Sequence, residues 1–233
     1  MRKINLQKYI ASCGICSRRK AEQLIINQKI KINEKIAKVT DRVNEGDVVK
    51  FSNKIIKPEK NKIYIVLNKP TGYTCTAKTF KNEKNIFSLI NIKERLFTIG
   101  RLDKESSGLL ILTNDGNLAL KLSHPRYKHE KKYEITVDQK IKKEQISRLL
   151  SGVLIKNEND EYLAKTKKAE KITDNKILIT ITEGKKRQIR YMMEAVGLKT
   201  ISLKRIKISG LSLGDLALGK TRHLTKKEIE DLL

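Results

Sequence analysis

A glycine-flanked loop between two short apolar runs constrains the middle of the chain most. The runs cover residues 96–99 and 109–112, and each has the length of a buried β-strand. Strands hold a loop in a fixed position, so residues 100–108 can present their carboxylate, Asp103, to a cleft. Aspartate in such a sequence also commonly caps a turn through its own backbone. Composition alone favours that structural role for Asp103.

The chain after residue 62 is predicted to consist mainly of strands. An Asp174-Asn175 turn before an alternating run indicates a hairpin. Single helices among the strands, and hairpins in place of regular crossovers, indicate an α+β fold with a mainly antiparallel mixed sheet flanked by helices. The expected strands cover residues 62–67, 130–137, 176–182 and 200–208, and the expected helical segments are 118–122, 146–150 and a last helix opened by a capping box of Thr225 and Glu228.

The first sixty residues predict a separate small domain. Apolar residues at helical spacing indicate one helix before Gly14 and a second capped by Ser17. Residues 29–34 alternate like a strand, and residues 46–51 form a turn followed by a second short strand. A polar, lysine-rich stretch then contains Pro58 and shows no periodicity. The expected boundaries are residues 1–52 for the first domain, 53–61 for a linker and 62–233 for the second domain.

The charge of the chain indicates a polyanionic partner. Its 51 basic and 26 acidic side chains give a formal net charge of +25, and the excess extends over both predicted domains. Nucleic acid is the natural partner, because cations that neutralise phosphates release condensed counterions and give salt-sensitive affinity. A membrane surface would need an amphipathic basic helix or a lipidation site, and neither is evident. With no apolar run of about 18 residues and no secretory signal pattern, we expect a cytoplasmic protein without a membrane partner.

Metal and redox chemistry have weak support. Cys13 and Cys16 have the spacing of a zinc or redox pair, but a structural zinc site needs a second pair, and the third cysteine, Cys75, is isolated. The three histidines are scattered, and none forms the i, i+4 pair of a metal-binding helix. We therefore expect neither a metal site nor a disulfide framework.

One sequence match indicates a different function. Residues 214–221, GDLALGKT, fit the P-loop pattern of nucleotide-binding ATPases and GTPases. Only 12 residues follow this segment, too few for the helix and strands that such a fold requires. We therefore interpret the match as a coincidence.

Three segments around Asp103 resemble the catalytic motif of the pseudouridine synthases that modify ribosomal RNA. They are GRLD at 100–103, SGLL at 107–110 and TNDG at 113–116. The sequence NKPTGY at 68–73 is similar to the start of that family's catalytic domain, and the layout of the first sixty residues resembles the S4 RNA-binding domain. The resemblance implies an S4-like domain followed by a catalytic domain that isomerises uridine to pseudouridine. Such an enzyme needs no cofactor.

The resemblance also implies roles for single residues. Asp103 falls at the position of the catalytic carboxylate, which acts on a nucleotide turned out of its stack. Arg190, at the end of the sequence EGKKRQIR, falls where an arginine pairs with that aspartate and keeps it ionised. Tyr133 matches the tyrosine that stacks on the target base, and Arg101 the arginine that helps to hold the extruded nucleotide. Without the resemblance, Tyr133 would be an ordinary core residue and Arg101 an ordinary surface residue.

Two basic clusters are candidate RNA contacts. One lies at the predicted start of the second helix, where free backbone N–H groups add to the cations. The other precedes Arg190. Each of these residues taken singly could be a solvated surface residue, but the clusters and the resemblance together favour RNA contact. The clusters are Arg18, Arg19 and Lys20, and Lys185, Lys186 and Arg187.

Several alternatives stay open at this point. A non-catalytic RNA-binding factor of ribosome assembly would keep the same fold and charge, although the aspartate, tyrosine and arginine together argue against it. The carboxylate of Asp103 either adds to the uracil ring or assists departure of uracil from the sugar. We expect a monomer that acts on ribosomal RNA or a ribosomal precursor particle, with 23S RNA favoured over 16S RNA.

Overall fold

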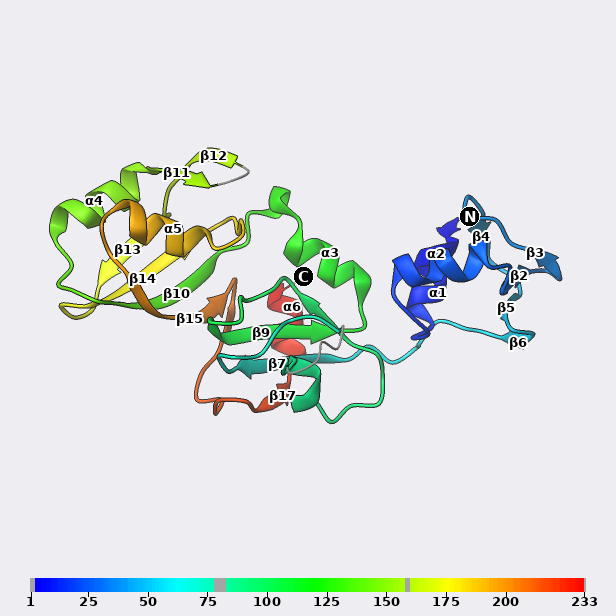
Figure 1. Ribbon diagram of the computed structural model, residues 1–233. Coiled ribbons are helices and arrows are strands. Elements are labelled where there is room, and N and C mark those ends of the chain that lie inside the picture. The colour runs from blue at the N-terminus through cyan, green and yellow to red at the C-terminus, as the bar shows by residue number, and fades with distance from the viewer. Residues whose placement is uncertain (1–2, 78–82, 158–159, 233) are drawn as a thin grey trace. The chain divides into compact units, whose positions relative to one another are not determined.

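The computed structural model describes residues 3–77, 83–157 and 160–232, which form two compact units (Figure 1). The first unit comprises the chain up to Ile63 together with Ile92–Phe97 and Thr113–Gly116. The second comprises Tyr64–Asn91, Thr98–Leu112 and the chain from Asn117 onward. Among the described residues, no helix combines the length and the apolar character needed to cross a bilayer.

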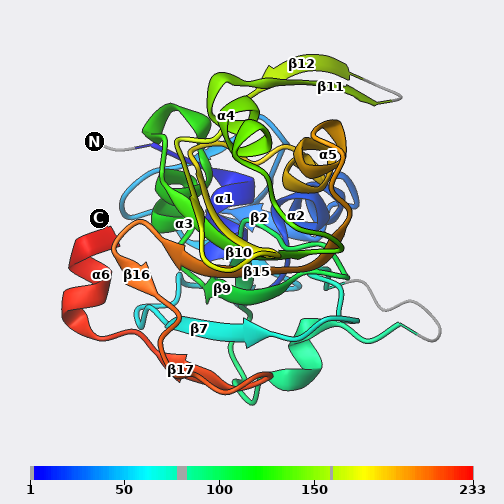
Figure 2. The same ribbon diagram turned by 90° about the vertical axis from the view of Figure 1, so that its left-hand side faces the viewer.

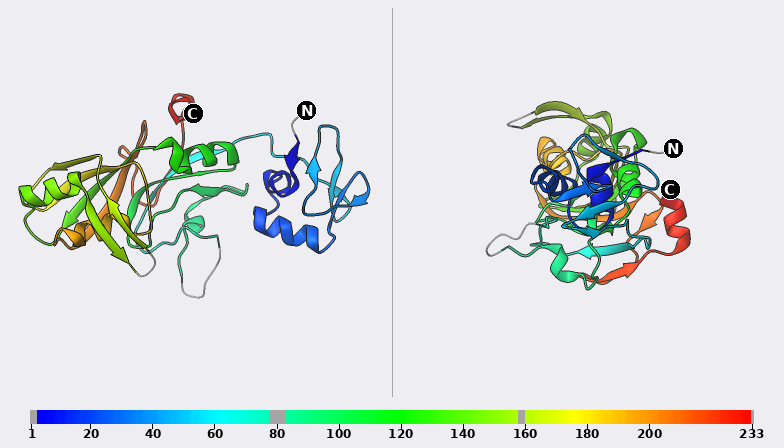
Figure 3. Two further views of the ribbon diagram at one scale, coloured as in Figure 1. Left: turned by 90° about the horizontal axis from the view of Figure 1, so that it is seen from above. Right: turned by 90° about the vertical axis from the view of Figure 1, so that its right-hand side faces the viewer.

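The first unit contains both predicted helices (Figure 3). They are α1 (Leu6–Ser12) and α2 (Arg18–Ile26). The Ser17 side chain accepts a hydrogen bond from the Lys20 N–H at 3.3 Å, which confirms the predicted cap of α2. The helices and strands of this unit share one core, to which Leu6, Ile10, Ala21, Ile25, Ile30 and Val49 contribute.

The strands of the first unit are two or three residues long. The predicted strands over residues 29–34 and 46–51 correspond to β2 and β5, which are neighbours in a sheet of order β3-β2-β5-β6. Two-residue strands cannot show alternation, so the others escaped prediction. The bounds are β1 (Ile4–Asn5), β2 (Ile30–Ile32), β3 (Lys35–Ile36), β4 (Arg42–Val43), β5 (Val49–Phe51) and β6 (Lys54–Ile55).

The segment expected to be a linker, residues 53–61, is in part structured. It contains β6, which pairs with β5. Beyond β6, the Ile56 N–H donates to the Val49 carbonyl and the Glu59 N–H to the Ser12 carbonyl, each at 2.9 Å. The strand is only two residues long and Ile55 is 58% exposed, so neither an alternation nor a buried residue marks it. The segment therefore belongs to the first unit at least as far as residue 59.

The second unit is built on a mixed, mostly antiparallel sheet with flanking helices, as predicted (Figures 1 and 2). Its strands follow the order β13-β14-β10-β15-β9-β7-β17, with β16 on β15 and β8 on β9. Helices α4 and α5 lie on one face of this sheet. The helices are α3 (Gly116–Ser123), α4 (Lys143–Ser151), α5 (Gln188–Ala195) and α6 (Lys226–Leu232), with the short 3-10 helices η1 (Ile86–Leu89) and η2 (Pro125–Tyr127). The strands are β7 (Tyr64–Lys69), β8 (Phe97–Ile99), β9 (Ser107–Thr113), β10 (Lys131–Val137), β13 (Lys168–Lys171), β14 (Lys176–Ile181), β15 (Thr200–Ile208), β16 (Leu211–Ser212) and β17 (Thr221–His223), and a separate hairpin is formed by β11 (Val153–Asn157) and β12 (Asp160–Ala164).

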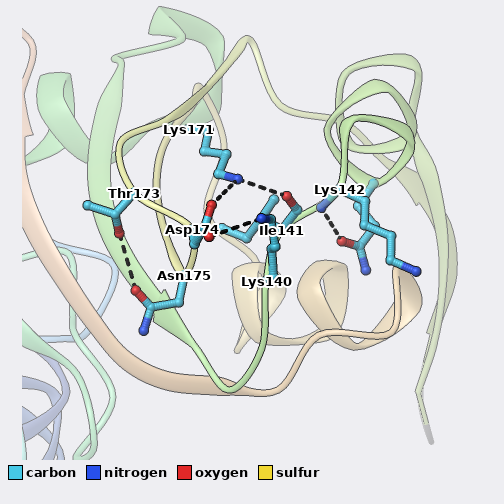
Figure 4. Close-up of polar contacts among 8 residues, drawn as sticks. Lys140, Ile141, Lys142, Lys171, Thr173, Asp174 and Asn175 are labelled. Carbon is cyan, nitrogen blue, oxygen red and sulfur yellow. Dashed lines mark hydrogen bonds and ion pairs between the residues drawn. The ribbon is translucent and has the colours of Figure 1, made fainter.

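The predicted hairpin at the Asp174-Asn175 turn is confirmed by the antiparallel pairing of β13 with β14. Figure 4 shows how this turn is joined to the chain before α4. The Lys171 ammonium donates to the Ile141 carbonyl at 3.2 Å and to the Asp174 carboxylate at 2.8 Å. The Ile141 N–H in turn donates to the Asp174 carbonyl at 2.7 Å. The turn and the start of α4 are therefore held together by backbone as well as side-chain bonds.

The segment that resembles a P-loop lies between β16 and β17. A strand follows it, whereas a phosphate-binding P-loop is followed by a helix. The Asn68 side chain donates to the Leu216 carbonyl at 2.7 Å, which fastens this loop to β7. Further along, the Thr225 N–H donates to the Glu228 carboxylate at 2.8 Å and the Glu228 N–H to the Thr225 hydroxyl at 3.2 Å, so the predicted capping box is confirmed.

Gly108 allows strand β9 to pair with strand β15 in the middle of the sheet. Strands β9 and β15 run parallel and pair at only two positions, Ser107 with Lys204 and Gly108 with Arg205. Gly108 has φ +101°, and a Cβ atom there would lie 2.2 Å from the Arg205 carbonyl oxygen. A side chain at this position would push the strands apart.

We therefore expect Gly108→Ala to destabilise the second unit strongly. The matched control is Gly197→Ala, where φ is +77° but a Cβ atom meets nothing within 4 Å. Backbone strain alone should cost the control about 1–2 kcal/mol of unfolding free energy, whereas Gly108→Ala should cost about 4 kcal/mol or more. Urea unfolding of both variants measures the difference, and equal losses would contradict the close approach of β9 and β15.

Candidate active site

The second unit contains a cavity of about 760 Å³, a size typical of small-molecule sites. Its walls come from the loop between β8 and β9, from strands β10 and β15, and from the segment that leads into α5. Six of the predicted site residues line it: Arg101, Asp103 and Tyr133, and the cluster Lys185, Lys186 and Arg187. Residues far apart in the sequence therefore meet around one hollow.

Asp103 lies in the loop between β8 and β9, and both of these strands were predicted. The residue is half-buried, and its own carbonyl accepts the Ser106 N–H at 3.0 Å, so the loop is a closed turn. The turn-capping role considered for the Asp103 side chain is not observed, because in the described part of the chain its carboxylate accepts no hydrogen bond. It is therefore available to a ligand in the cavity.

A buried lysine holds this loop. The ammonium of Lys69, at the end of β7, is completely buried and donates to four carbonyl oxygens. Burial lowers the pKa of Lys69, but carbonyl acceptors favour the protonated amine. The Lys69 ammonium therefore fixes the backbone at Asp103 and in the residues that follow it. Its acceptors are the carbonyls of Pro70 at 3.0 Å, Asp103 at 3.1 Å, Lys104 at 3.4 Å and Ser106 at 2.8 Å.

Two further contacts support the same loop from the chain after β7. The Gly72 N–H donates to the Lys104 carbonyl at 2.7 Å. The Cys75 thiol donates to the Leu102 carbonyl at 3.2 Å. The segment NKPTGY at 68–73, together with Cys75, is thus the main support of the Asp103 loop.

Tyr133 lies on β10, in the middle of the sheet. Its side chain is 7% exposed and lines the cavity. The neighbours across the sheet are Ile179 on β14 and Arg205 on β15. An aromatic ring fixed by strands on both sides offers a rigid surface for a flat ligand.

Arg190 reaches the Asp103 loop but contacts its backbone. Its side chain, on α5, is 8% exposed, and Nη2 donates to the Glu105 carbonyl at 3.2 Å. In the described part of the chain, no ion pair joins Arg190 to the carboxylate of Asp103, and Arg190 is not in the cavity lining. The expected pairing with Asp103 therefore stays a prediction.

The nearby carboxylate that does have an arginine partner belongs to Glu105. Arg187 Nη1 lies 3.2 Å from Glu105 Oε2. The carboxylate's hydrogen bond with its own backbone N–H lowers the pKa of Glu105, and the charges of Arg187 and Arg190 lower it further. Arg187 therefore pairs with a carboxylate of the Asp103 loop and also lines the cavity.

The basic clusters occupy two different units. Lys185, Lys186 and Arg187 line the cavity of the second unit, and the Lys185 amine lies 3.4 Å from the ring centre of Tyr162. The cluster of Arg18, Arg19 and Lys20 forms the exposed first turn of α2 in the first unit. Both clusters present cations that a phosphate can reach.

Lys69 and Arg205 are site residues that the sequence analysis missed. Lys69 adjoins a turn, where lysines are usually solvated, so nothing in its neighbourhood marks it as buried. Arg205 gave a clearer signal, because it occupies the same face of an alternating strand as Leu203. Both Leu203 and Arg205 line the cavity.

The described residues contain no group of three or more histidine, cysteine, aspartate or glutamate side chains that could hold a metal ion. The three cysteines are free thiols. Burial, with a smaller effect of Glu59, raises the pKa of Cys13 to about 12. Such a thiol is protonated at neutral pH and is a poor ligand or nucleophile.

The clamp formed by Lys69 can be tested by removing its charge. Lys69→Met removes one donor from four carbonyl oxygens, of which those of Asp103 and Lys104 keep a backbone N–H partner. The loss should lower the unfolding free energy of the second unit by about 2–4 kcal/mol. The matched control is Lys104→Met on the same loop, an exposed residue whose replacement should cost less than about 0.5 kcal/mol. Urea unfolding that gave the same stability for both variants would contradict the clamp.

Comparison with known proteins identifies both units. A family model described as RNA pseudouridylate synthase matches residues 63–195, and the S4 domain model matches residues 4–49. A crystal structure of a pseudouridylate synthase superposes with a TM-score of 0.73 at 28% sequence identity, and the match covers 99% of this chain and 100% of that one.

Curated relatives match over almost the whole chain. The dual-specificity RNA pseudouridine synthase RluF of Escherichia coli (strain K12) is 39% identical over 231 residues, which are 98% of this chain and 78% of the relative. The ribosomal large subunit pseudouridine synthase B of Bacillus subtilis (strain 168) is 39% identical over 233 residues, which are 97% of this chain and 94% of the relative. The chain therefore belongs to the RNA pseudouridylate synthase family and carries an S4 domain before its synthase domain.

Proposed function

We propose that this enzyme converts a specific uridine of ribosomal RNA to pseudouridine, with Asp103 as the catalytic nucleophile. The observation that carries the proposal is the cavity that Asp103, Tyr133 and Arg101 line together. A uridine inside an RNA helix is inaccessible, so the target nucleotide must turn out of its stack and enter this cavity. The names of the relatives in Escherichia coli and Bacillus subtilis support the reaction and the substrate class.

The reaction breaks the bond between C1′ of the ribose and N1 of uracil and forms a bond between C1′ and C5. No electrons are gained or lost, and one proton leaves C5 while one is taken up at N1. The carboxylate of Asp103 either adds to the uracil ring or stabilises the sugar as uracil departs. Tyr133 stacks on the base and helps to move the C5 proton, and Arg101 holds the extruded nucleotide.

Arg190 is proposed to provide the charge that keeps Asp103 ionised. Its guanidinium already bonds the loop two residues after Asp103, and its Nε has no hydrogen-bond partner among the described residues. A small side-chain movement on RNA binding would let this spare donor contact the carboxylate. Arginine suits the role because it stays charged at physiological pH.

The basic clusters are proposed to anchor the RNA. Arg18, Arg19 and Lys20 are assigned to the S4 domain's RNA contact, and the cluster Lys185, Lys186 and Arg187 to phosphates beside the target nucleotide. The name of the Bacillus subtilis relative favours 23S RNA over 16S RNA. We further propose that the protein acts as a cytoplasmic monomer on this RNA or on a ribosomal precursor particle.

Replacement of the carboxylate tests the catalytic assignment. Ribosomal RNA without pseudouridine is incubated with the wild type, with Asp103→Asn and with Glu105→Gln, and pseudouridine is mapped chemically. We expect one modified uridine with the wild type and a loss of at least about 10⁴-fold in rate with Asp103→Asn, because the reaction has no other nucleophile. Glu105→Gln removes a neighbouring carboxylate of the same loop and should change the rate less than about tenfold.

Two results would contradict the proposal. Modification by Asp103→Asn at the wild-type rate would exclude Asp103 as the nucleophile. Absence of pseudouridine with the wild type, in the presence of tight RNA binding, would favour the non-catalytic assembly factor.

The anchoring role of the S4 cluster predicts a change in salt dependence. Binding affinity falls as salt rises. Changing Arg18, Arg19 and Lys20 to glutamine should make the negative slope of log affinity against log salt shallower by about 2. A control with Lys142, Lys143 and Lys199 changed to glutamine has the same net charge and should keep the wild-type slope. Filter-binding titrations between low and moderate salt measure both slopes, and identical slopes would exclude phosphate contact by the α2 cluster.

A further inference from the structure

Arg205 is a buried cation whose position the proposed roles do not explain. It lies in the middle of β15, is 3% exposed and lines the cavity. Its Nε donates to the Leu109 carbonyl at 2.8 Å, but Nη2 has no hydrogen-bond partner among the described residues. No carboxylate in the described part of the chain forms an ion pair with it. A buried charge without a carboxylate partner is costly, and a bound ligand would supply the acceptor that Nη2 lacks.

A purely structural role would not require an arginine here. The single bond to the Leu109 carbonyl needs one donor, which a neutral side chain can also supply. The close approach of β15 to Gly108 involves the backbone of Arg205 and is independent of its side chain. The guanidinium group therefore has donor capacity beyond what the fold uses.

The position of Arg205 relates it to the target base. It is the residue directly paired with Tyr133 across β10 and β15, so the two side chains lie on the same face of the sheet. A second cation of the cavity wall is Lys131, whose amine lies 3.4 Å from the Glu183 carbonyl. Burial lowers the pKa of Lys131, and the charge of Arg205 lowers it further. Two neighbouring cations suit a substrate that gains negative charge between them.

We propose that Arg205 is a further catalytic residue, which donates hydrogen bonds to a carbonyl oxygen of the target uracil and stabilises the negative charge that the ring acquires. This inference rests on the proposed function. It adds a residue that acts on a carbonyl oxygen of the base, whereas Asp103 acts on the sugar or on ring carbon C6.

Negative charge reaches the carbonyl oxygens by either route of the reaction. If Asp103 adds at C6, the electron pair of the C5–C6 double bond moves toward O4. If the bond between C1′ and N1 breaks first, its electron pair stays on uracil and spreads over O2 and O4. In both cases the charge is neutralised again when C5 bonds to C1′ and N1 takes up a proton. C5 then loses its proton, and on the addition route the bond between Asp103 and C6 breaks in the same step, which restores the C5–C6 double bond and frees the carboxylate. Arg205 stays protonated throughout, so it stabilises the charge without a proton transfer.

The test combines protein variants with RNA in which one oxygen is changed. Short synthetic RNAs span the uridine that the wild type modifies and carry uridine, 2-thiouridine or 4-thiouridine at that position. Sulfur accepts hydrogen bonds poorly, so each thio substitution weakens one carbonyl contact. The proteins are the wild type, Arg205→Gln, Arg205→Lys and, as a matched control, Lys207→Gln, which removes an exposed cation from the same strand. Single-turnover rate constants and RNA dissociation constants are measured for every pair.

We expect Arg205→Gln to slow the reaction of the uridine RNA about 100-fold, as for loss of an oxyanion donor. RNA affinity should change less than about threefold, because phosphate contacts dominate it. The Lys207→Gln rate should equal the wild-type rate. With one of the two thio RNAs, the defect of Arg205→Gln should shrink to below about tenfold, because the contact is already weakened and the two changes are not additive.

Four results would overturn the inference. If the wild type is active and Arg205→Gln reacts at the same rate, the role of Arg205 is excluded and the proposed function stands. If the wild type has no activity on any RNA, the proposed function is overturned as well. An equal defect with all three RNAs assigns Arg205 to the fold. A defect in affinity without a defect in rate makes it a phosphate contact. If Arg205→Gln does not fold, Arg205→Lys keeps a donor for the Leu109 carbonyl and the same comparison decides.

Discussion

The donation of the Lys69 ammonium to four backbone carbonyls is the contact on which the site depends. It joins the end of β7 to the Asp103 loop at residues 103, 104 and 106, so the backbone of this loop is held by the fold. A buried ammonium normally needs a carboxylate, but here the partial charges of carbonyl oxygens replace it. The arrangement leaves the carboxylate of Asp103 unused by the fold. A loop held by its backbone can thus offer its acidic side chain entirely to the substrate.

Among the charged groups around the cavity, some bond to the rest of the fold and others keep free donors or acceptors. Arg187 pairs with Glu105, and Arg190 bonds the Glu105 carbonyl. Asp103 on the loop and Arg205 on the sheet keep free acceptors and donors. Electrostatic catalysis requires such preorganised groups, because they need no rearrangement when charge develops in the transition state. Tyr133 and Arg205 lie on paired strands of the sheet, which hold both residues in fixed positions.

The sequence predicted those features whose signal is local. The strands on either side of Asp103, the cap of α2 by Ser17 and the capping box of α6 follow from apolar period and turn chemistry, and the structure confirms them. The two-residue strands, including β6 in the expected linker, are too short to show a period. The burial of Lys69 and the contact of Arg190 with the Glu105 carbonyl depend on segments that meet only in three dimensions. No local pattern encodes these contacts.

The central claim is that the cavity beside Asp103 receives a uridine turned out of its RNA stack. The most direct measurement is a crystal structure of the Asp103→Asn protein bound to an RNA that carries the target uridine. We predict that the uracil lies against the ring of Tyr133, with C1′ or C6 next to the substituted side chain at position 103 and a carbonyl oxygen within hydrogen-bond distance of Arg205. A target uridine that stays stacked in the RNA, or that binds outside this cavity, would contradict the account.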